Sequence, residues 1–163
     1  MARRTRATAT EPPPCAEPFA TGWDTPPVGR QGVSVFCEDS EESYASAFIA
    51  TPRQCARYVR SEYCDSEAAQ FIQQQPGRCA YVVSLEAGET RRGVGGRMLQ
   101  VLLDDLKNQG VVNVYLHAMP SGGLSREDLL RFYRKFGFAD KSTAQSWQGR
   151  LVAPFLMKKL RGS

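Results

Sequence analysis

The feature that most constrains the fold is a glycine-rich stretch, Arg91-Arg92-Gly93-Val94-Gly95-Gly96, between a strand pattern and a helix pattern. Before it, residues 79–85 are rich in β-branched and aromatic side chains, which favours a strand. Glycine permits positive φ and lets an anion approach the backbone. The N–H groups and dipole of the following helix favour a pyrophosphate there, and two arginines add positive charge. The helix is indicated by apolar residues at helical spacing: Met98, Leu99, Leu102, Leu103 and Leu106.

The spacing of the glycines separates the known phosphate-binding turns. A P-loop requires Gly-Lys followed by Ser or Thr, and the chain contains no such sequence. A dinucleotide-binding fold requires Gly-x-Gly-x-x-Gly, but Met98 stands where the third glycine would follow Gly93 and Gly95. A turn that only joins a strand to a helix is the alternative interpretation.

A second motif follows in residues 129–138, where Phe132-Tyr133 precedes Gly137-Phe138. Together with the x-x-Gly-x-Gly turn at residues 90–95 and a strand pattern at residues 110–117, it resembles the GNAT acyltransferases. The resemblance covers residues 78–160, about half of the chain. It implies an α/β (α+β) fold: a mixed, mostly antiparallel central sheet flanked by helices, with a V-shaped splay between the two central strands.

The chain is expected to consist of a Pro-rich, basic, disordered tail over residues 1–30 and a single GNAT-like domain over residues 31–163. The tail contains six of the ten prolines and few aliphatic residues, so it cannot bury enough apolar surface to fold. Strands are predicted at residues 32–38 and 42–50. A helix should begin at Thr51-Pro52, and a second one should be capped by Asp65 or Ser66. GNAT domains usually place further strands between such helices and the glycine turn, and here none is indicated.

The C-terminal half has clearer boundaries. The helix after the glycine turn should end before Gly110, a residue suited to the left-handed conformation. Ser125 is a plausible N-cap of the next helix, which Gly137 should end. The last strand is predicted at residues 153–157, with a companion strand at residues 144–148.

The resemblance also implies a cofactor site for acetyl-CoA. By position, backbone groups of Val83, Ser84 and Leu85 would pair with the pantetheine arm. The pyrophosphate would be held by the main-chain N–H groups of the glycine stretch: Arg91, Arg92, Gly93, Val94, Gly95 and Gly96. Thr90 departs from the Gln or Arg that the family prefers at that position.

Three residues are candidates for the chemistry. Tyr133 occupies the position of the family's tyrosine, which protonates the departing thiolate; a half-buried core aromatic is the alternative. His117 ends the strand where several family members carry a glutamate base, and an imidazole suits that work. A structural histidine at a strand end is equally compatible with the sequence. Glu86 is the rival base, with an exposed loop carboxylate as its alternative.

Composition limits the remaining possibilities. Five cysteines without a C-x-x-C pair and one histidine argue against a metal site and a disulfide scaffold. No apolar run approaches the roughly 18 residues that span a bilayer, so the protein is expected to be cytoplasmic, with no membrane partner. The net charge of +4 favours an anionic ligand.

The function predicted from this resemblance is an N-acetyltransferase that moves an acetyl group from acetyl-CoA to a primary amine by direct attack. The amine, of a small molecule or a protein, and the oligomeric state stay open. Two alternatives remain: a GNAT-like domain that binds CoA or a partner without catalysis, and an acetyltransferase directed to nucleic acid by its basic tail.

Overall fold

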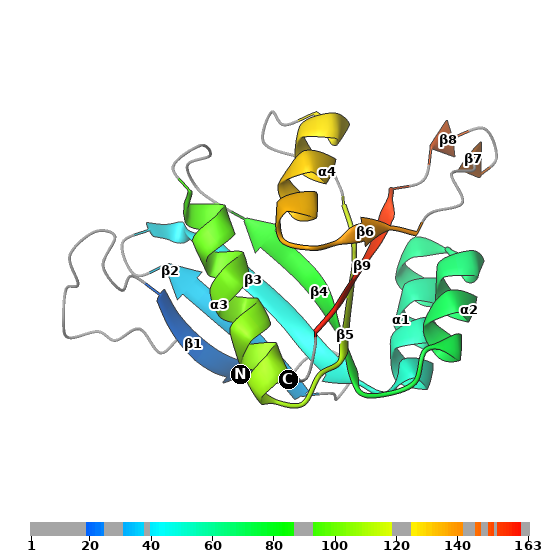
Figure 1. Cartoon of the computed structure of the whole chain (residues 1–163), viewed down its shortest axis with the longest axis horizontal. Coiled ribbons are helices and arrows are strands. Elements are labelled where there is room, and N and C mark those ends of the chain that lie inside the picture. Colours follow the sequence, from blue (N-terminus) through cyan, green and yellow to red (C-terminus); the bar gives the residue numbers. More distant parts are fainter. Residues whose placement is uncertain are drawn as a thin grey trace. The chain divides into compact units, whose positions relative to one another are not determined.

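The structure is a computed structural model that describes residues 19–24, 31–37, 40–86, 93–118, 125–141, 146–147, 150–151 and 153–160. Within these ranges, side chains are described from residue 45 onward, except at positions 86, 94, 146–147 and 150–151. The chain forms two compact units. Figure 1 labels the helices and strands. The first contains Met1–Ile49 and Val82–Gly110, and the second contains Ala50–Tyr81 and Val111–Ser163.

Strands that follow one another along the chain form the sheet of the first unit. β1 (Phe19–Asp24) pairs antiparallel with β2 (Gln31–Cys37), and β2 pairs antiparallel with β3 (Ser40–Ala50). β4 (Cys79–Glu86) is the other hydrogen-bonded neighbour of β3. The hydroxyl oxygens of Ser46 on β3 and Ser84 on β4 lie 3.1 Å apart.

Helix α3 (Val94–Asn108) packs on β1 and β2. It ends before Gly110, whose φ of 87° is the left-handed conformation predicted for that residue. Its apolar face is the one that the sequence indicates, because the five residues at helical spacing are all buried: Met98, Leu99, Leu102, Leu103 and Leu106.

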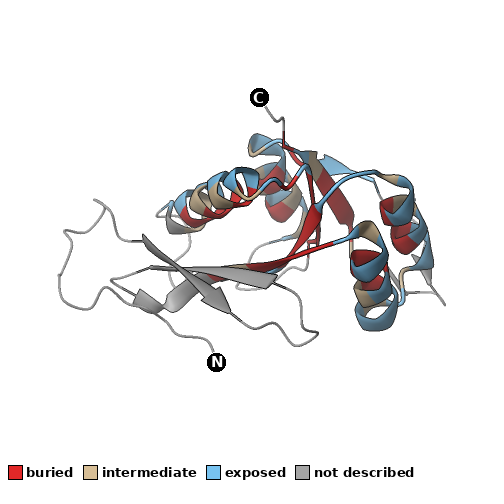
Figure 2. Ribbon diagram, turned by 90° about the horizontal axis from the view of Figure 1, so that it is seen from below, coloured by how far each residue is buried: buried red, intermediate tan, exposed pale blue. Residues whose placement is uncertain are grey.

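Two consecutive helices open the second unit and pack against each other. α1 (Pro52–Tyr63) begins at Thr51, which exchanges hydrogen bonds with Gln54: the Thr51 hydroxyl accepts from the Gln54 N–H, and the Gln54 side chain accepts from the Thr51 N–H. α2 (Ser66–Gln74) is capped by Asp65, so of the two caps considered from the sequence, Asp65 has this role. Figure 2 shows buried residues along one side of the described helices and exposed residues along the other.

The sheet of the second unit is mixed. Cys79, Ala80 and Tyr81 of β4 pair in parallel with β5 (Asn113–His117), and β5 pairs antiparallel with β9 (Phe155–Lys159). The short strand β6 (Ala139–Asp140) continues this sheet beside β9, while β7 (Ser146–Trp147) and β8 (Arg150–Leu151) form a separate pair. Between β5 and β6 the chain forms α4 (Arg126–Lys135), capped by Ser125 as predicted.

The expected fold class is confirmed, because most of the described strand pairs are antiparallel, β4–β5 is parallel, and helices accompany the sheet. α1 and α2 directly precede β4, which is the departure from the GNAT order that the sequence indicates. The last strand lies two residues later than predicted. β1 lies within the stretch assigned to the tail; residues 1–18 and 25–30 are outside the described residues, and the division into tail and domain remains a prediction.

No helix within the described ranges is long and apolar enough to cross a membrane. The same ranges contain no group of three or more His, Cys, Asp or Glu side chains arranged to hold a metal ion.

Gly77 provides a test of the packing beside β5. Its φ is 99°, and a Cβ added there would lie 2.5 Å from Cγ2 of Val112, a stiff β-branched side chain. We expect Gly77→Ala to lower the free energy of unfolding by about 2 kcal/mol or more, from backbone strain plus this clash. Urea denaturation at neutral pH measures the change.

Gly137→Ala is the matched control for this prediction. Gly137 has a φ of 92°, but the atom nearest its added Cβ is Nζ of Lys158, the far end of a flexible side chain. Only the backbone strain of about 1 kcal/mol should remain. Adding Val112→Ala to Gly77→Ala should return the loss to that level. Equal losses in the two single variants would contradict the assigned clash.

Candidate functional site

The first turn of α3 has the backbone geometry expected of an anion site. Gly93, its N-cap, has a φ of 78° in the left-handed region, and its carbonyl accepts the Arg97 N–H at 3.1 Å. In the part of the chain that the structure describes, no side chain caps this helix. The N–H groups of Val94, Gly95 and Gly96 therefore have no acceptor within the helix. Arg91 and Arg92 lie outside the described residues.

β4 supplies the second part of the predicted cofactor site. Among the described residues, its pairing with β5 ends at Tyr81 opposite Tyr115, where the two central strands are expected to separate. Beyond that point Val83 is 44% exposed, whereas Ser84 and Leu85 are half-buried. The Ser84 hydroxyl contacts that of Ser46. Val83, Ser84 and Leu85 thus belong to the same unit as the start of α3.

Tyr133 lies on α4 in an aromatic cluster. It is 7% exposed, and its ring meets those of Phe132 and Phe138 edge-on, with centroids 5.1 and 5.6 Å apart. Gly137, with a φ of 92°, reverses the chain, and the Phe138 N–H then donates to the Tyr133 carbonyl at 3.2 Å. The Phe-Tyr-x-x-x-Gly-Phe motif therefore fixes the orientation of the Tyr133 ring by packing.

His117 ends β5 with its side chain fully buried and both ring nitrogens hydrogen-bonded. Nδ1 lies 2.6 Å from the Tyr81 hydroxyl, and Nε2 lies 3.0 Å from Oδ2 of Asp65. The Tyr63 ring stacks on the imidazole with an interplanar angle of 7° and ring centroids 4.2 Å apart. The ring centroid of Phe155 lies 5.2 Å from that of the imidazole. We call this group of Tyr63, Asp65, Tyr81 and His117 the histidine cluster.

The electrostatics of the histidine cluster indicate which atoms carry the protons. Burial by itself would raise the pKa of Asp65, but hydrogen bonds from His117 and the Ala68 N–H, with the charge interaction with His117, lower its pKa overall. Burial, with the neighbouring hydroxyls of Tyr63 and Tyr58, raises the pKa of Tyr81 far above its ordinary value. The neutral Tyr81 hydroxyl therefore faces Nδ1, and the Asp65 carboxylate accepts from Nε2–H.

The α1–α2 junction brings two members of the histidine cluster together. Cys64, between Tyr63 and Asp65, has a φ of 51° and is the only described residue other than glycine with positive φ. This left-handed residue costs about 1 kcal/mol and lets the side chains before and after it both reach His117. The sequence indicated Asp65 only as a cap, and it gave no sign of the roles of Tyr63 and Tyr81.

The third candidate, Glu86, ends β4, and its side chain lies outside the described residues. The loop at residues 119–124 is outside them as well. The catalytic roles assigned to Tyr133, His117 and Glu86 from the sequence remain predictions.

Solved structures share this fold. Arabidopsis thaliana NAA60 in complex with acetyl-CoA matches with a TM-score of 0.56 at 14% identity, over 79% of this chain and 76% of that one. A GNAT family acetyltransferase from Elizabethkingia anophelis with acetyl-CoA bound matches with a TM-score of 0.51 at 10% identity, over 88% and 99%. The NatC complex bound to Gag peptide and CoA matches with a TM-score of 0.51 at 9% identity, over 80% and 71%.

No model of a known protein family matches the sequence, and no curated protein sequence matches it significantly. At the identities above, the likeness concerns the fold. The chain has the fold of the GNAT acetyltransferases, as its two motifs predict.

The Asp65–His117 pair predicts a pH-dependent stability. Because the pKa of Asp65 is lowered on folding, its contribution is fully present above its unfolded value of about 4 and is lost as the pH falls through the folded pKa. Asn is also a good N-cap, so Asp65→Asn removes mainly the interaction with His117. We expect a loss of about 1–3 kcal/mol in unfolding free energy at pH 7, which shrinks below pH 4.

Urea denaturation over a pH series measures this loss. Asp128→Asn is the control, because Asp128 is a half-exposed carboxylate that pairs with Arg131 on the surface of α4. Its substitution should change stability by less than about 0.5 kcal/mol at any pH. A loss in Asp65→Asn that stays constant through acid would contradict the assigned interaction between the Asp65 carboxylate and His117.

Proposed function

We propose that this protein is an acyl-CoA-dependent N-acyltransferase that transfers an acetyl group from acetyl-CoA to a primary amine. The observation that carries the proposal is the left-handed Gly93 at the start of α3, directly after β4, in a chain with the GNAT fold. Three consecutive N–H groups without helical acceptors at this turn suit a diphosphate. Two of the matched solved structures are complexes with acetyl-CoA, which supports the choice of cofactor.

The residues present fit this cofactor. The N–H groups of Val94, Gly95 and Gly96 would hold the pyrophosphate, and Arg91 and Arg92 would add charge. The backbone of Val83, Ser84 and Leu85, which has no partner in β5 among the described pairs, would bind the pantetheine arm. When bound, acetyl-CoA supplies the acyl group and a thiolate leaving group.

The chain's own residues would accept one proton and donate another. The amine must be neutral to attack the thioester carbon, so a base has to accept its proton; Glu86 and His117 are the candidates. The departing thiolate must gain a proton, and Tyr133, protonated at neutral pH, is the proposed donor. Both His117 nitrogens are hydrogen-bonded, so proton uptake there would require its bond with Tyr81 or Asp65 to rearrange.

This same arrangement favours a second candidate function, a domain that binds CoA without catalysis. An imidazole enclosed by Tyr63, Asp65 and Tyr81 stabilises the fold whether or not a reaction takes place. Cofactor binding without CoA release over a broad amine panel would favour this candidate over the enzyme.

Binding of acetyl-CoA is the first test of the proposal. At about 100 times its dissociation constant, a ligand adds about 2.7 kcal/mol, which should raise the melting temperature by roughly 5–10 °C. Gly96→Glu should abolish this shift, because a carboxylate at the start of α3 repels the diphosphate. It should not destabilise the unliganded protein, since an acidic residue is favourable at a helix N-terminus.

Lys107→Gln is the matched control for the charge. It makes the same change in net charge near the other end of α3 and should keep the full shift. No shift in the wild-type protein, or an equal shift in Gly96→Glu, would reject the assigned cofactor site.

The second test concerns Tyr133. Tyr133→Phe keeps the ring packing against Phe132 and Phe138 but removes the proposed acid, so kcat should fall about 100-fold while the acetyl-CoA-induced melting shift is unchanged. CoA release with the best amine of a substrate panel measures kcat. Tyr58→Phe, which removes a hydroxyl from α1, is the control and should keep most of the activity. Wild-type turnover that survives Tyr133→Phe would exclude Tyr133 as the acid.

A further inference from the structure

The exposed face of α1 carries three arginines in a row. Arg53, Arg57 and Arg60 are all exposed and stand at positions i, i+4 and i+7 of the helix. At 3.6 residues per turn, this spacing confines them to an arc of about 60° and spreads them over about 10 Å along the axis. We call these three residues the arginine stripe.

The arginine stripe points away from the core of its unit. Cys55, Ala56 and Val59 form the buried face of α1, whose centre lies about 120° around the helix axis from the stripe. Glu62, the acidic residue of this helix, lies about 140–180° around the axis from the stripe. Within the described part of the chain, no ion pair or hydrogen bond engages any of the three guanidinium groups.

Helix α2, packed beside α1, exposes three glutamines together with one acidic residue, Glu67. Gln70, Gln73 and Gln74 are exposed on it, and Ala68, Ala69 and Ile72 are buried on its other side. The amides of these glutamines can donate hydrogen bonds to an anionic ligand. Like charges at i, i+4 spacing repel one another, so the Arg53–Arg57 pair does not stabilise α1.

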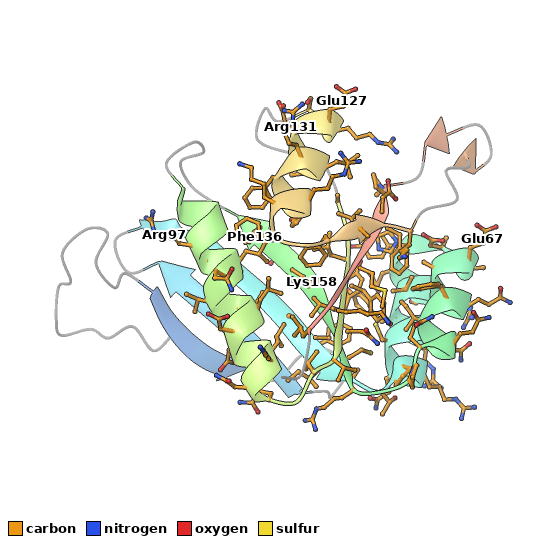
Figure 3. All side chains as sticks on the ribbon, in the orientation of Figure 1. Glu67, Arg97, Glu127, Arg131, Phe136 and Lys158 are labelled. Atoms are coloured by element: carbon orange, nitrogen blue, oxygen red, sulfur yellow. The ribbon has the colours of Figure 1, made fainter. Side chains whose placement is uncertain are left out.

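Helix α4 shows how this protein neutralises other basic side chains. α4 also exposes cations, including Arg131, Arg134 and Lys135, but its first turn carries Glu127 and Asp128. The Asp128 carboxylate lies 3.0 Å from Nη1 of Arg131; Glu127 and Arg131 are labelled in Figure 3. Arg131 of α4 thus has an acidic partner, whereas within the described residues no ion pair involves the arginine stripe.

We propose that the arginine stripe binds the phosphate backbone of a nucleic acid. The planar guanidinium fork binds phosphate oxygens in pairs, and a linear row of three matches a linear chain of phosphates. A helix that lies on a membrane needs large apolar side chains exposed near its cationic face, and the exposed residues that flank this stripe are Gln54 and Ser61. Backbone contacts of this kind do not read sequence, so the binding is independent of base sequence. This inference does not depend on the proposed acyl transfer.

The test measures binding of the full chain to fluorescein-labelled single-stranded RNA and DNA by fluorescence anisotropy over about 50–200 mM salt. Each phosphate contact contributes roughly 0.7 to the slope of log affinity against log salt for single strands. The triple variant Arg53→Gln, Arg57→Gln, Arg60→Gln should therefore lower the slope by about 2 and weaken binding about tenfold or more at low salt. Gln is also a good helix former, so circular dichroism should show α1 intact.

The matched control is Arg131→Gln, Arg134→Gln, Lys135→Gln on α4, which removes the same net charge. It should weaken binding no more than about two- to threefold. Equal losses in the two variants would reduce the effect to net charge and overturn the proposal. Absence of binding by the wild-type protein, or full binding by the stripe variant, would also overturn the proposal. Stripe-dependent binding to phosphatidylserine vesicles or polyglutamate, without binding to the oligonucleotides, would reassign the surface to a membrane or an acidic protein.

Discussion

The packing of the second unit depends on the hydrogen bonds of the buried His117 imidazole. A polar ring enclosed at a strand end requires a hydrogen-bond partner for each nitrogen. β4 supplies one partner, the hydroxyl of Tyr81, and the α1–α2 junction supplies the other, the carboxylate of Asp65. The two oxygens of that carboxylate have different partners: Oδ1 caps α2 and Oδ2 accepts from His117. One side chain therefore sets both the start of α2 and the position of that helix on the sheet.

The sequence predicted those elements whose signals come from neighbouring residues, and it missed those that depend on distant partners. α1 and α4 were predicted with their caps because Thr51 and Ser125 act within a few residues of themselves, and α3 was predicted from its apolar spacing after the glycine turn. β1 escaped prediction because its residues stand among prolines and small polar residues without clear alternation. β6 and β8 were missed because such short strands take their conformation from their partners. β7 lies within the strand predicted at residues 144–148, but it pairs with β8.

The same distinction between local signals and long-range contacts applies to the candidate site. The glycine turn and the Phe-Tyr-x-x-x-Gly-Phe motif were found from the sequence because each is a local device built on glycine conformation. The histidine cluster was not, because Asp65 and His117 are 52 residues apart and neither lies in a pattern that points to the other. A single histidine in the chain could indicate a special position, but only the packing of α1 and α2 shows which side chains surround it.

Two different modes of anion recognition are proposed for this chain, and their physics suits different ligands. The start of α3 offers directional backbone N–H groups that an anion reaches only where side chains are absent, which suits a compact diphosphate held at close range. The arginine stripe offers mobile guanidinium groups at the surface of α1, spread along a line, which suits an extended polyanion bound with a strong salt dependence. Since the residues of the two features belong to different units and share no member, one ligand need not displace the other from its contacts. A nucleic acid on α1 would then act by concentrating the protein on a polymer, while the glycine turn stays available to a diphosphate.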